Sequence, residues 1–197
     1  MLAVIAALSA PLLAADPLVD VRTVVPDVVL DVRYATKDNF LGRPVYPRAA
    51  AFLRRSTALR LKKAADLLRA EGRRLVVFDA YRPFSVQKLM WKAEPDRRYV
   101  ADPARGGSIH NRGGAVDVSL ADLSGRELEM PSPFDDFGPR AWRGAKGVPA
   151  AARRNLRVLE AAMKKAGFKP LPEEWWHYED PDARSWPVLD VPLEDLK

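Results

Sequence analysis

The sequence contains no cysteine, and this absence excludes several kinds of site at once. Without a thiol there can be no disulfide framework, no Cys₄ zinc site, no iron–sulfur cluster and no cysteine nucleophile. Histidine is nearly as scarce, because His110 and His177 are the only two in 197 residues. Any histidine-based chemistry must therefore use one of these residues or both.

Charged side chains are missing from residues 1–15, which are almost wholly apolar. The run is too short to cross a bilayer, which takes about 20 apolar residues, so we expect no stable membrane insertion. Its length and the small residues Ala14 and Ala15 favour a cleaved signal peptide, although the positive segment that usually starts such a signal is absent. We therefore predict a signal peptide over 1–15 and a periplasmic location, or a cytoplasmic one if these residues are not a signal.

Acidic residues are fewer than basic ones, 26 against 32, which gives a net charge of +6. A basic chain favours anionic surroundings such as nucleic acid, an acidic membrane face or a cell-wall polymer. The basic residues are scattered in pairs, and the sequence has no zinc finger, aromatic RNA-binding signature or long basic block. We therefore expect no nucleic-acid partner, and the charge indicates a solvated basic surface.

The length and the hydropathy pattern predict a single α+β domain over 16–197. Apolar residues at helical spacing, bounded by Gly or Pro, predict three helices, and short apolar runs predict strands with hairpin-type connections. We expect a small, mainly antiparallel sheet flanked by these helices. The predicted helices are 56–71, 85–93 (capped by Ser85) and 149–166; the predicted strands are 74–79, 115–120 and a hairpin return strand within 123–130.

A Gly-rich loop carries His110, and Asp117 follows seven residues later on the predicted strand 115–120. The glycines at 113 and 114 let the chain bend so that an imidazole and a carboxylate can converge. Taken alone, a loop histidine followed by a strand aspartate is more often a pair of unrelated surface side chains than a metal site.

The second histidine, His177, follows Glu174-Trp175-Trp176, in a segment that is either strand-like or a helical turn. By itself it would be a hydrogen-bonded core residue. Together, His110, Asp117 and His177 provide two imidazoles and a carboxylate, a set typical of catalytic zinc with a fourth position left for water. Glu174 is then the carboxylate that takes a proton from this water. Because residues three apart face opposite sides of a strand, Glu174 needs a turn or a bulge to reach the metal.

A third motif, Asp79-Ala-Tyr-Arg82-Pro83, ends the predicted strand 74–79. Pro83 prevents further strand pairing, so Arg82 is expected at the edge of the sheet. There it could stabilise an oxyanion beside the metal, or it could form a salt bridge with a neighbouring aspartate. The sequence favours neither role over the other.

The spacing of these motifs resembles that of the zinc peptidases of the D-Ala-D-Ala metallopeptidase group, family M15. The residues that carry the resemblance are Ser108-x-His110-x-x-Gly113-x-Ala115-x-Asp117 and Glu174-x-x-His177. Two further segments, DVRYATKDNF at 31–40 and DAYRP at 79–83, resemble the D-alanyl-D-alanine dipeptidase, or VanX-like, branch. The likeness covers residues 19–186, and it implies an α+β enzyme with a zinc site in a cleft on the sheet.

This resemblance also implies a role for each matching residue and one Zn²⁺ per chain. The implied metal ligands are His110, Asp117 and His177; the general base is Glu174; the residue that stabilises the transition state is Arg82; and the substrate-binding residues are Ser108, Tyr34 and one aspartate of the pair Asp135-Asp136, with Asp135 preferred. The implied reaction is zinc-dependent hydrolysis of the dipeptide D-alanyl-D-alanine to D-alanine during cell-wall turnover.

Two other functions are compatible with the sequence. The same chemistry in a wider cleft would produce a D,D-carboxypeptidase or endopeptidase acting on longer peptidoglycan peptides, although the segment 34–40 favours the dipeptidase. A non-catalytic, zinc-stabilised wall-binding module would need neither Glu174 nor Arg82, so the presence of both counts against it. The sequence predicts no oligomeric state.

Overall fold

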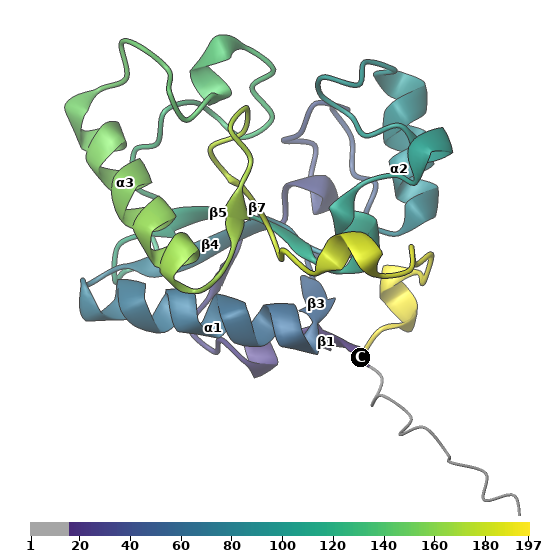
Figure 1. Ribbon diagram of the computed structural model, residues 1–197, viewed down its shortest axis with the longest axis horizontal. Coiled ribbons are helices and arrows are strands. Elements are labelled where there is room, and N and C mark those ends of the chain that lie inside the picture. Colours follow the sequence, from purple (N-terminus) through teal and green to yellow (C-terminus); the bar gives the residue numbers. More distant parts are fainter. Residues whose placement is uncertain (1–15) are drawn as a thin grey trace, which may run out of the picture.

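A computed structural model describes residues 16–197 and has an α+β fold (Figure 1). The signal peptide predicted for 1–15 lies outside these residues. Within 16–197, no helix combines the length and the apolar character needed to cross a membrane. The predicted fold class, a mainly antiparallel sheet flanked by helices, is confirmed.

The larger of two sheets has five strands in the order β2-β4-β5-β7-β6. Strand β2 pairs with β4 in parallel, and every other pair is antiparallel. A separate two-stranded sheet joins β1 to β3. The strands are β1 (Leu18–Asp20), β2 (Val29–Leu30), β3 (Phe52–Arg54), β4 (Arg74–Asp79), β5 (Ala115–Ala121), β6 (Lys169–Pro170) and β7 (His177–Glu179).

Strands β4 and β5 lie at the centre of the core, because all seven residues of β5 and all but Arg74 of β4 are buried. Three helices surround them: α1 (Arg55–Ala70), α2 (Phe84–Ala93) and α3 (Ala150–Lys165). Helix α1 buries Leu61 and Leu68, which recur at helical spacing, and packs beside β4. Figure 1 shows α1 below the central strands, and α3 and α2 on either side of the loops above them. These loops carry much of the site.

The predicted return strand within 123–130 is wrong. The chain does turn back after β5, but one isolated bridge, between Ala121 and Glu127, is its only strand-like pairing in the described part of the chain. The reason is competition for one edge of β5. The Val118 N–H donates to Trp176 O (3.0 Å) beside β7, and the next inter-strand position, Leu120 O, accepts from Leu128 N–H (2.8 Å). Since β7 takes most of this edge, only the end of β5 is left for the returning segment.

The predicted cap at Ser85 is also wrong. Helix α2 begins at Phe84, and its cap position is Pro83, which forms no side-chain cap. The Ser85 N–H instead donates to the Asp190 carboxylate (2.7 Å). The acceptor for the start of this helix therefore comes from more than a hundred residues away, where local sequence gives no signal.

Candidate active site

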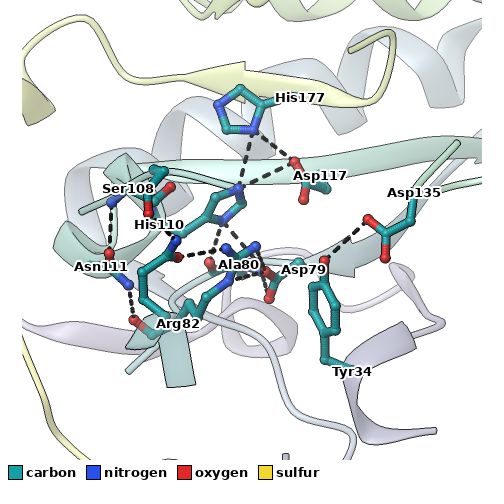
Figure 2. Close-up of polar contacts among 12 residues, drawn as sticks. Tyr34, Asp79, Ala80, Arg82, Ser108, His110, Asn111, Asp117, Asp135 and His177 are labelled. Atoms are coloured by element: carbon teal, nitrogen blue, oxygen red, sulfur yellow. Dashed lines mark hydrogen bonds and ion pairs between the residues drawn. The ribbon is translucent and has the colours of Figure 1, made fainter. Parts of the chain in front are cut away.

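Strand pairing brings two of the expected metal ligands together. Asp117 of β5 lies directly opposite His177 of β7 in the register, so their side chains project from the same face. His110 comes from the 3₁₀ helix η4 (Ile109–Arg112), which precedes β5. Asp117 Oδ1 lies 2.9 Å from His177 Nδ1 and 3.3 Å from His110 Nε2 (Figure 2).

The chemistry of this donor set fits a zinc ion. The three side chains are buried, and one ligand atom from each lies within 4.8 Å of the other two. Burial alone would raise the pKa of Asp117, but the imidazoles of His110 and His177 hold it well below its usual range, so the carboxylate is ionised. Two imidazoles and one carboxylate beside a cavity form a three-ligand set with room for a further ligand, as catalytic zinc requires.

A backbone carbonyl orients the first imidazole. His110 Nδ1 lies 2.6 Å from Ala80 O, which can only accept, so Nδ1 carries a proton and Nε2 is the nitrogen that faces the site. His177 has a comparable contact, because its Nε2 lies 3.5 Å from a Glu179 carboxylate oxygen. Each imidazole therefore turns its other nitrogen, His110 Nε2 and His177 Nδ1, toward Asp117.

Glycine is required at both positions between η4 and β5, for a different physical reason at each. Gly113 ends η4 with a φ of 71°, a left-handed conformation that other residues adopt at a cost. At Gly114 a Cβ would lie 2.2 Å from the Cβ of Ala183, so only glycine fits. This close approach lets the chain pass directly from the histidine into the strand that carries Asp117.

A turn, and not a strand, aims Glu174 at the site. Strand β7 begins only at His177, and the His177 N–H donates to Glu174 O (3.3 Å) in the preceding turn. A Glu174 carboxylate oxygen then lies 3.8 Å from His177 Nδ1. Burial raises the pKa of Glu174 above its ordinary value. The turn that Glu174 needs is therefore present. Its carboxylate lies beside the three candidate metal ligands His110, Asp117 and His177, which we call the metal set, but is not one of them.

Arg82 forms the salt bridge that the sequence allowed, and it also lies where it could contact an oxyanion. Its Nε and Nη2 donate to Asp79 Oδ2 (3.1 and 2.7 Å), and its Nη1 donates to Gln87 Oε1 (2.8 Å). A guanidinium has five N–H donors, so these three contacts do not use all of them. Because Arg82 also lines the cavity beside the metal set, a salt bridge and an oxyanion contact are compatible.

Three residues hold Arg82 in place, directly or through Asp79, and the sequence reasoning allowed only for a neighbouring aspartate. Asp79 is fully buried and also accepts from Tyr46 Oη (2.7 Å) and from its neighbour's backbone N–H. Gln87, on α2, is fully buried as well and donates to Ala101 O (2.7 Å). The position of Asp79 in the same motif as Arg82 was a usable signal. Nothing in the sequence distinguishes Tyr46 or Gln87 from ordinary core residues.

The expected substrate-binding residues line the same cavity. Tyr34 Oη donates to Asp135 Oδ1 (3.1 Å), as Figure 2 shows, and the Phe40 N–H donates to Asp135 Oδ2 (3.3 Å). Burial raises the pKa of Asp135 to about 7. Its neighbour Asp136 faces elsewhere, since it accepts from the Gly138 N–H and pairs with Arg140. Of the two candidate aspartates, only Asp135 lines this cavity.

Ser108 lies at the same cavity but already has a structural role. Its Oγ accepts from the His110 N–H (3.2 Å), and its own N–H donates to Asn111 Oδ1 (2.7 Å), which together form a capping box at the start of η4. The hydroxyl proton remains available as a donor. Ser108 therefore positions His110 and can also contact a small ligand.

The cavity has a volume of about 290 Å³, which suits a small molecule and not an extended chain. The residues expected to act on a substrate all line it: Tyr34, Arg82, Ser108, His110, Asp117, Asp135, Glu174 and His177. They come from six separate stretches of the chain. This site is therefore a product of the tertiary fold.

Comparison of the sequence with known proteins shows its family. The sequence profile of a peptidase family described as "D-ala-D-ala dipeptidase" matches residues 14–194. A D-alanyl-D-alanine dipeptidase from Escherichia coli is 39% identical over 172 residues, covering 87% of this chain and 89% of the relative. One from Enterococcus faecalis is 34% identical over 189 residues, covering 84% and 88%. Among solved structures, VanYB in complex with D-Alanine-D-Alanine has a TM-score of 0.43 at 20% identity, covering 68% of this chain and 75% of that one.

Proposed function

The chain belongs to the D-Ala-D-Ala dipeptidase family of peptidases, family M15, and from this premise we propose that it is a zinc hydrolase that cleaves D-alanyl-D-alanine into two molecules of D-alanine. One observation carries the proposal. His110, Asp117 and His177 converge at a cavity of about 290 Å³ that also contains Glu174 and Arg82. Three metal ligands, the Glu174 carboxylate with its raised pKa, and the Arg82 guanidinium are together the groups that hydrolysis of an amide requires.

Proton transfer in this reaction is assigned to Glu174. His110, Asp117 and His177 would hold the zinc ion, which when bound acts as a Lewis acid on the scissile carbonyl and on water. Glu174 removes a proton from the attacking water and delivers it to the leaving nitrogen, so that the C–N bond breaks and a carboxylate and an amine result. Burial raises the pKa of Glu174, which favours the protonated form that acts as the acid in the second half of this cycle.

The N–H donors of Arg82 that Asp79 and Gln87 do not use stabilise the negative charge that develops on the carbonyl oxygen. Because Asp79 and Gln87 hold the guanidinium on one side, these donors are oriented before the substrate binds, which is the condition for effective oxyanion stabilisation. Asp135 and Tyr34 would receive the free ammonium of the dipeptide at the other end of the cavity. The carboxylate supplies the charge, and Ser108 adds a hydroxyl.

Removal of the metal is the first test of this function. Incubation with a chelator should reduce D-alanine release from D-Ala-D-Ala to background, and added Zn²⁺ should restore it, because the metal set is assembled by the fold before binding. The measurement is D-alanine release by the purified protein. Failure of the zinc-loaded, folded protein to release D-alanine would contradict the proposal and favour longer wall peptides or a binding role.

The ionisation of Asp135 makes substrate binding depend on pH. Asp135 is ionised only above about pH 7, because burial raises its pKa to about 7, whereas the substrate ammonium keeps its proton up to about pH 8. The KM for D-Ala-D-Ala should therefore rise as the pH falls through 7. Asp135→Asn should raise KM at pH 7.5 by about ten- to a hundredfold, the worth of one charged hydrogen bond, and flatten this dependence.

The control for this prediction is Asp136→Asn, because Asp136 faces away from the cavity. It should change KM by less than about twofold, because its carboxylate contacts the Gly138 N–H and Arg140 and no residue of the catalytic cavity. A larger effect from Asp136 than from Asp135 would reverse the assignment. The measurement is KM as a function of pH for the native protein and both variants.

Location is a separate part of the proposal. The uncharged, apolar residues 1–15 and the wall-derived substrate support a cleaved signal peptide and a periplasmic enzyme. Both remain predictions from the sequence.

A further inference from the structure

The catalytic cavity adjoins a second hollow, of about 560 Å³, on the outer side of Glu174. Trp142, which is 55% exposed, lines the second hollow but not the catalytic cavity. Several residues line both and therefore form the boundary between them: Arg97, Arg98, Tyr99, Phe137, Leu171, Glu174 and Trp176. The extent of the space beside the general base depends on this boundary.

Two aromatic rings stack at this boundary, and a third ring, from the catalytic cavity, packs against them. Tyr99 and Phe137 are stacked, with ring centroids 4.5 Å apart and ring planes within 10°. Phe40, which lines the catalytic cavity, contacts Phe137, with ring centroids 5.3 Å apart. Phe40 lies in the loop after Tyr34, Tyr99 follows α2, and Phe137 lies in the loop before α3. We call Phe40, Tyr99 and Phe137 the aromatic wall.

The aromatic wall stands next to the carboxylate that would bind the substrate ammonium. The backbone N–H of Phe40 donates to Asp135 Oδ2 (3.3 Å), and Phe137 is only two residues beyond Asp135. All three rings are partly buried and line the catalytic cavity. A residue attached to the substrate nitrogen at Asp135 would therefore extend into these rings.

We propose that the aromatic wall restricts this enzyme to dipeptides by closing the catalytic cavity at the amino end of the substrate. The inference rests on the proposed function and deepens it. Opening the stack of Tyr99 and Phe137 would join the cavity of about 290 Å³ to the hollow of about 560 Å³. A peptide with an additional residue before D-Ala-D-Ala would then have space, while the metal set, Glu174 and Arg82 would be unchanged.

The test compares one dipeptide with one tripeptide. D-alanine release from D-Ala-D-Ala and from L-Ala-D-Ala-D-Ala is measured as kcat/KM for the native protein, Phe137→Ala and Tyr99→Ala. The ratio of tripeptide to dipeptide activity should rise at least tenfold in both variants. Trp142→Ala is the matched control, because it removes an aromatic ring from the second hollow without touching the catalytic cavity, and it should leave the ratio unchanged.

The outcomes separate this inference from the function on which it rests. If the native protein releases no D-alanine from the dipeptide, the proposed function fails. If the native protein cleaves the dipeptide and the ratio stays within twofold of native in the wall variants, the aromatic wall is overturned. If the alanine variants unfold, the ratio of tripeptide to dipeptide activity is measured for Phe137→Leu, which keeps an apolar side chain but removes the stack. It too should raise the ratio.

Discussion

Replacing Glu174 with glutamine is expected to reduce kcat for D-Ala-D-Ala hydrolysis by about 10²- to 10⁴-fold, the range associated with a general acid–base group. Glutamine has the shape of glutamate but neither removes nor delivers a proton. Zinc content should remain at one ion per chain, because the metal set consists of His110, Asp117 and His177. The measurements are kcat on the dipeptide and metal content of the purified variant.

Glu173→Gln is the matched control for this experiment. Glu173 is the preceding residue, is exposed and does not line the catalytic cavity, so its replacement should leave kcat within about twofold. Loss of zinc from Glu174→Gln would show instead that Glu174 is a ligand. Retention of native kcat would contradict its assignment as the general base.

Replacing Arg82 with methionine should produce two large effects. Loss of its oriented donors should lower kcat by about 10²- to 10³-fold, as for other oxyanion-binding groups. Stability should fall as well, by about 3–5 kcal/mol, because Asp79 is fully buried and would lose its charged partner. The measurements are kcat, from enzyme shown to be folded at the assay temperature, and the free energy of unfolding in urea.

A second substitution separates the two effects. In the double variant Asp79→Asn with Arg82→Met, no unpaired buried charge remains at this position, so part of the lost stability should return while kcat stays low. Native-like kcat in the double variant would mean that Arg82 has only a structural role. Arg82→Lys should also be poorly active, since an ammonium provides no planar fork to bind Asp79 and a substrate oxygen together.

The parts of the fold that the sequence predicted well depend on local patterns. Helix α1 and strands β4 and β5 were predicted within one residue, because each has a continuous apolar pattern with a Gly or an Asp at its end. The return strand within 123–130 was wrong because its partner edge on β5 is taken by β7, which begins at His177. Strand pairing of this kind is a competition between distant segments, so it cannot be predicted from local propensity.

The chemistry of the site was determined by the sequence. With no cysteine and two histidines, His110 and His177 were the only candidates for imidazole ligands. The spacing from His110 to Asp117 and from Glu174 to His177 predicted which carboxylates accompany them. The sequence also supplied a family likeness, which the comparisons confirm. Identity of this kind is carried by residue types and short spacings, which are readable along the chain.

The tertiary structure alone decided which side chains face one another. It placed Asp135 and not Asp136 in the cavity, showed that Arg82 pairs with Asp79 while also lining this cavity, and brought Phe40, Phe137 and Tyr99 into contact. These contacts join residues from about 40 to about 100 positions apart, except for the Arg82 pair, whose meaning depends on the cavity beside it. Side-chain direction and burial follow from packing between distant elements, so they become definite only when the chain is folded.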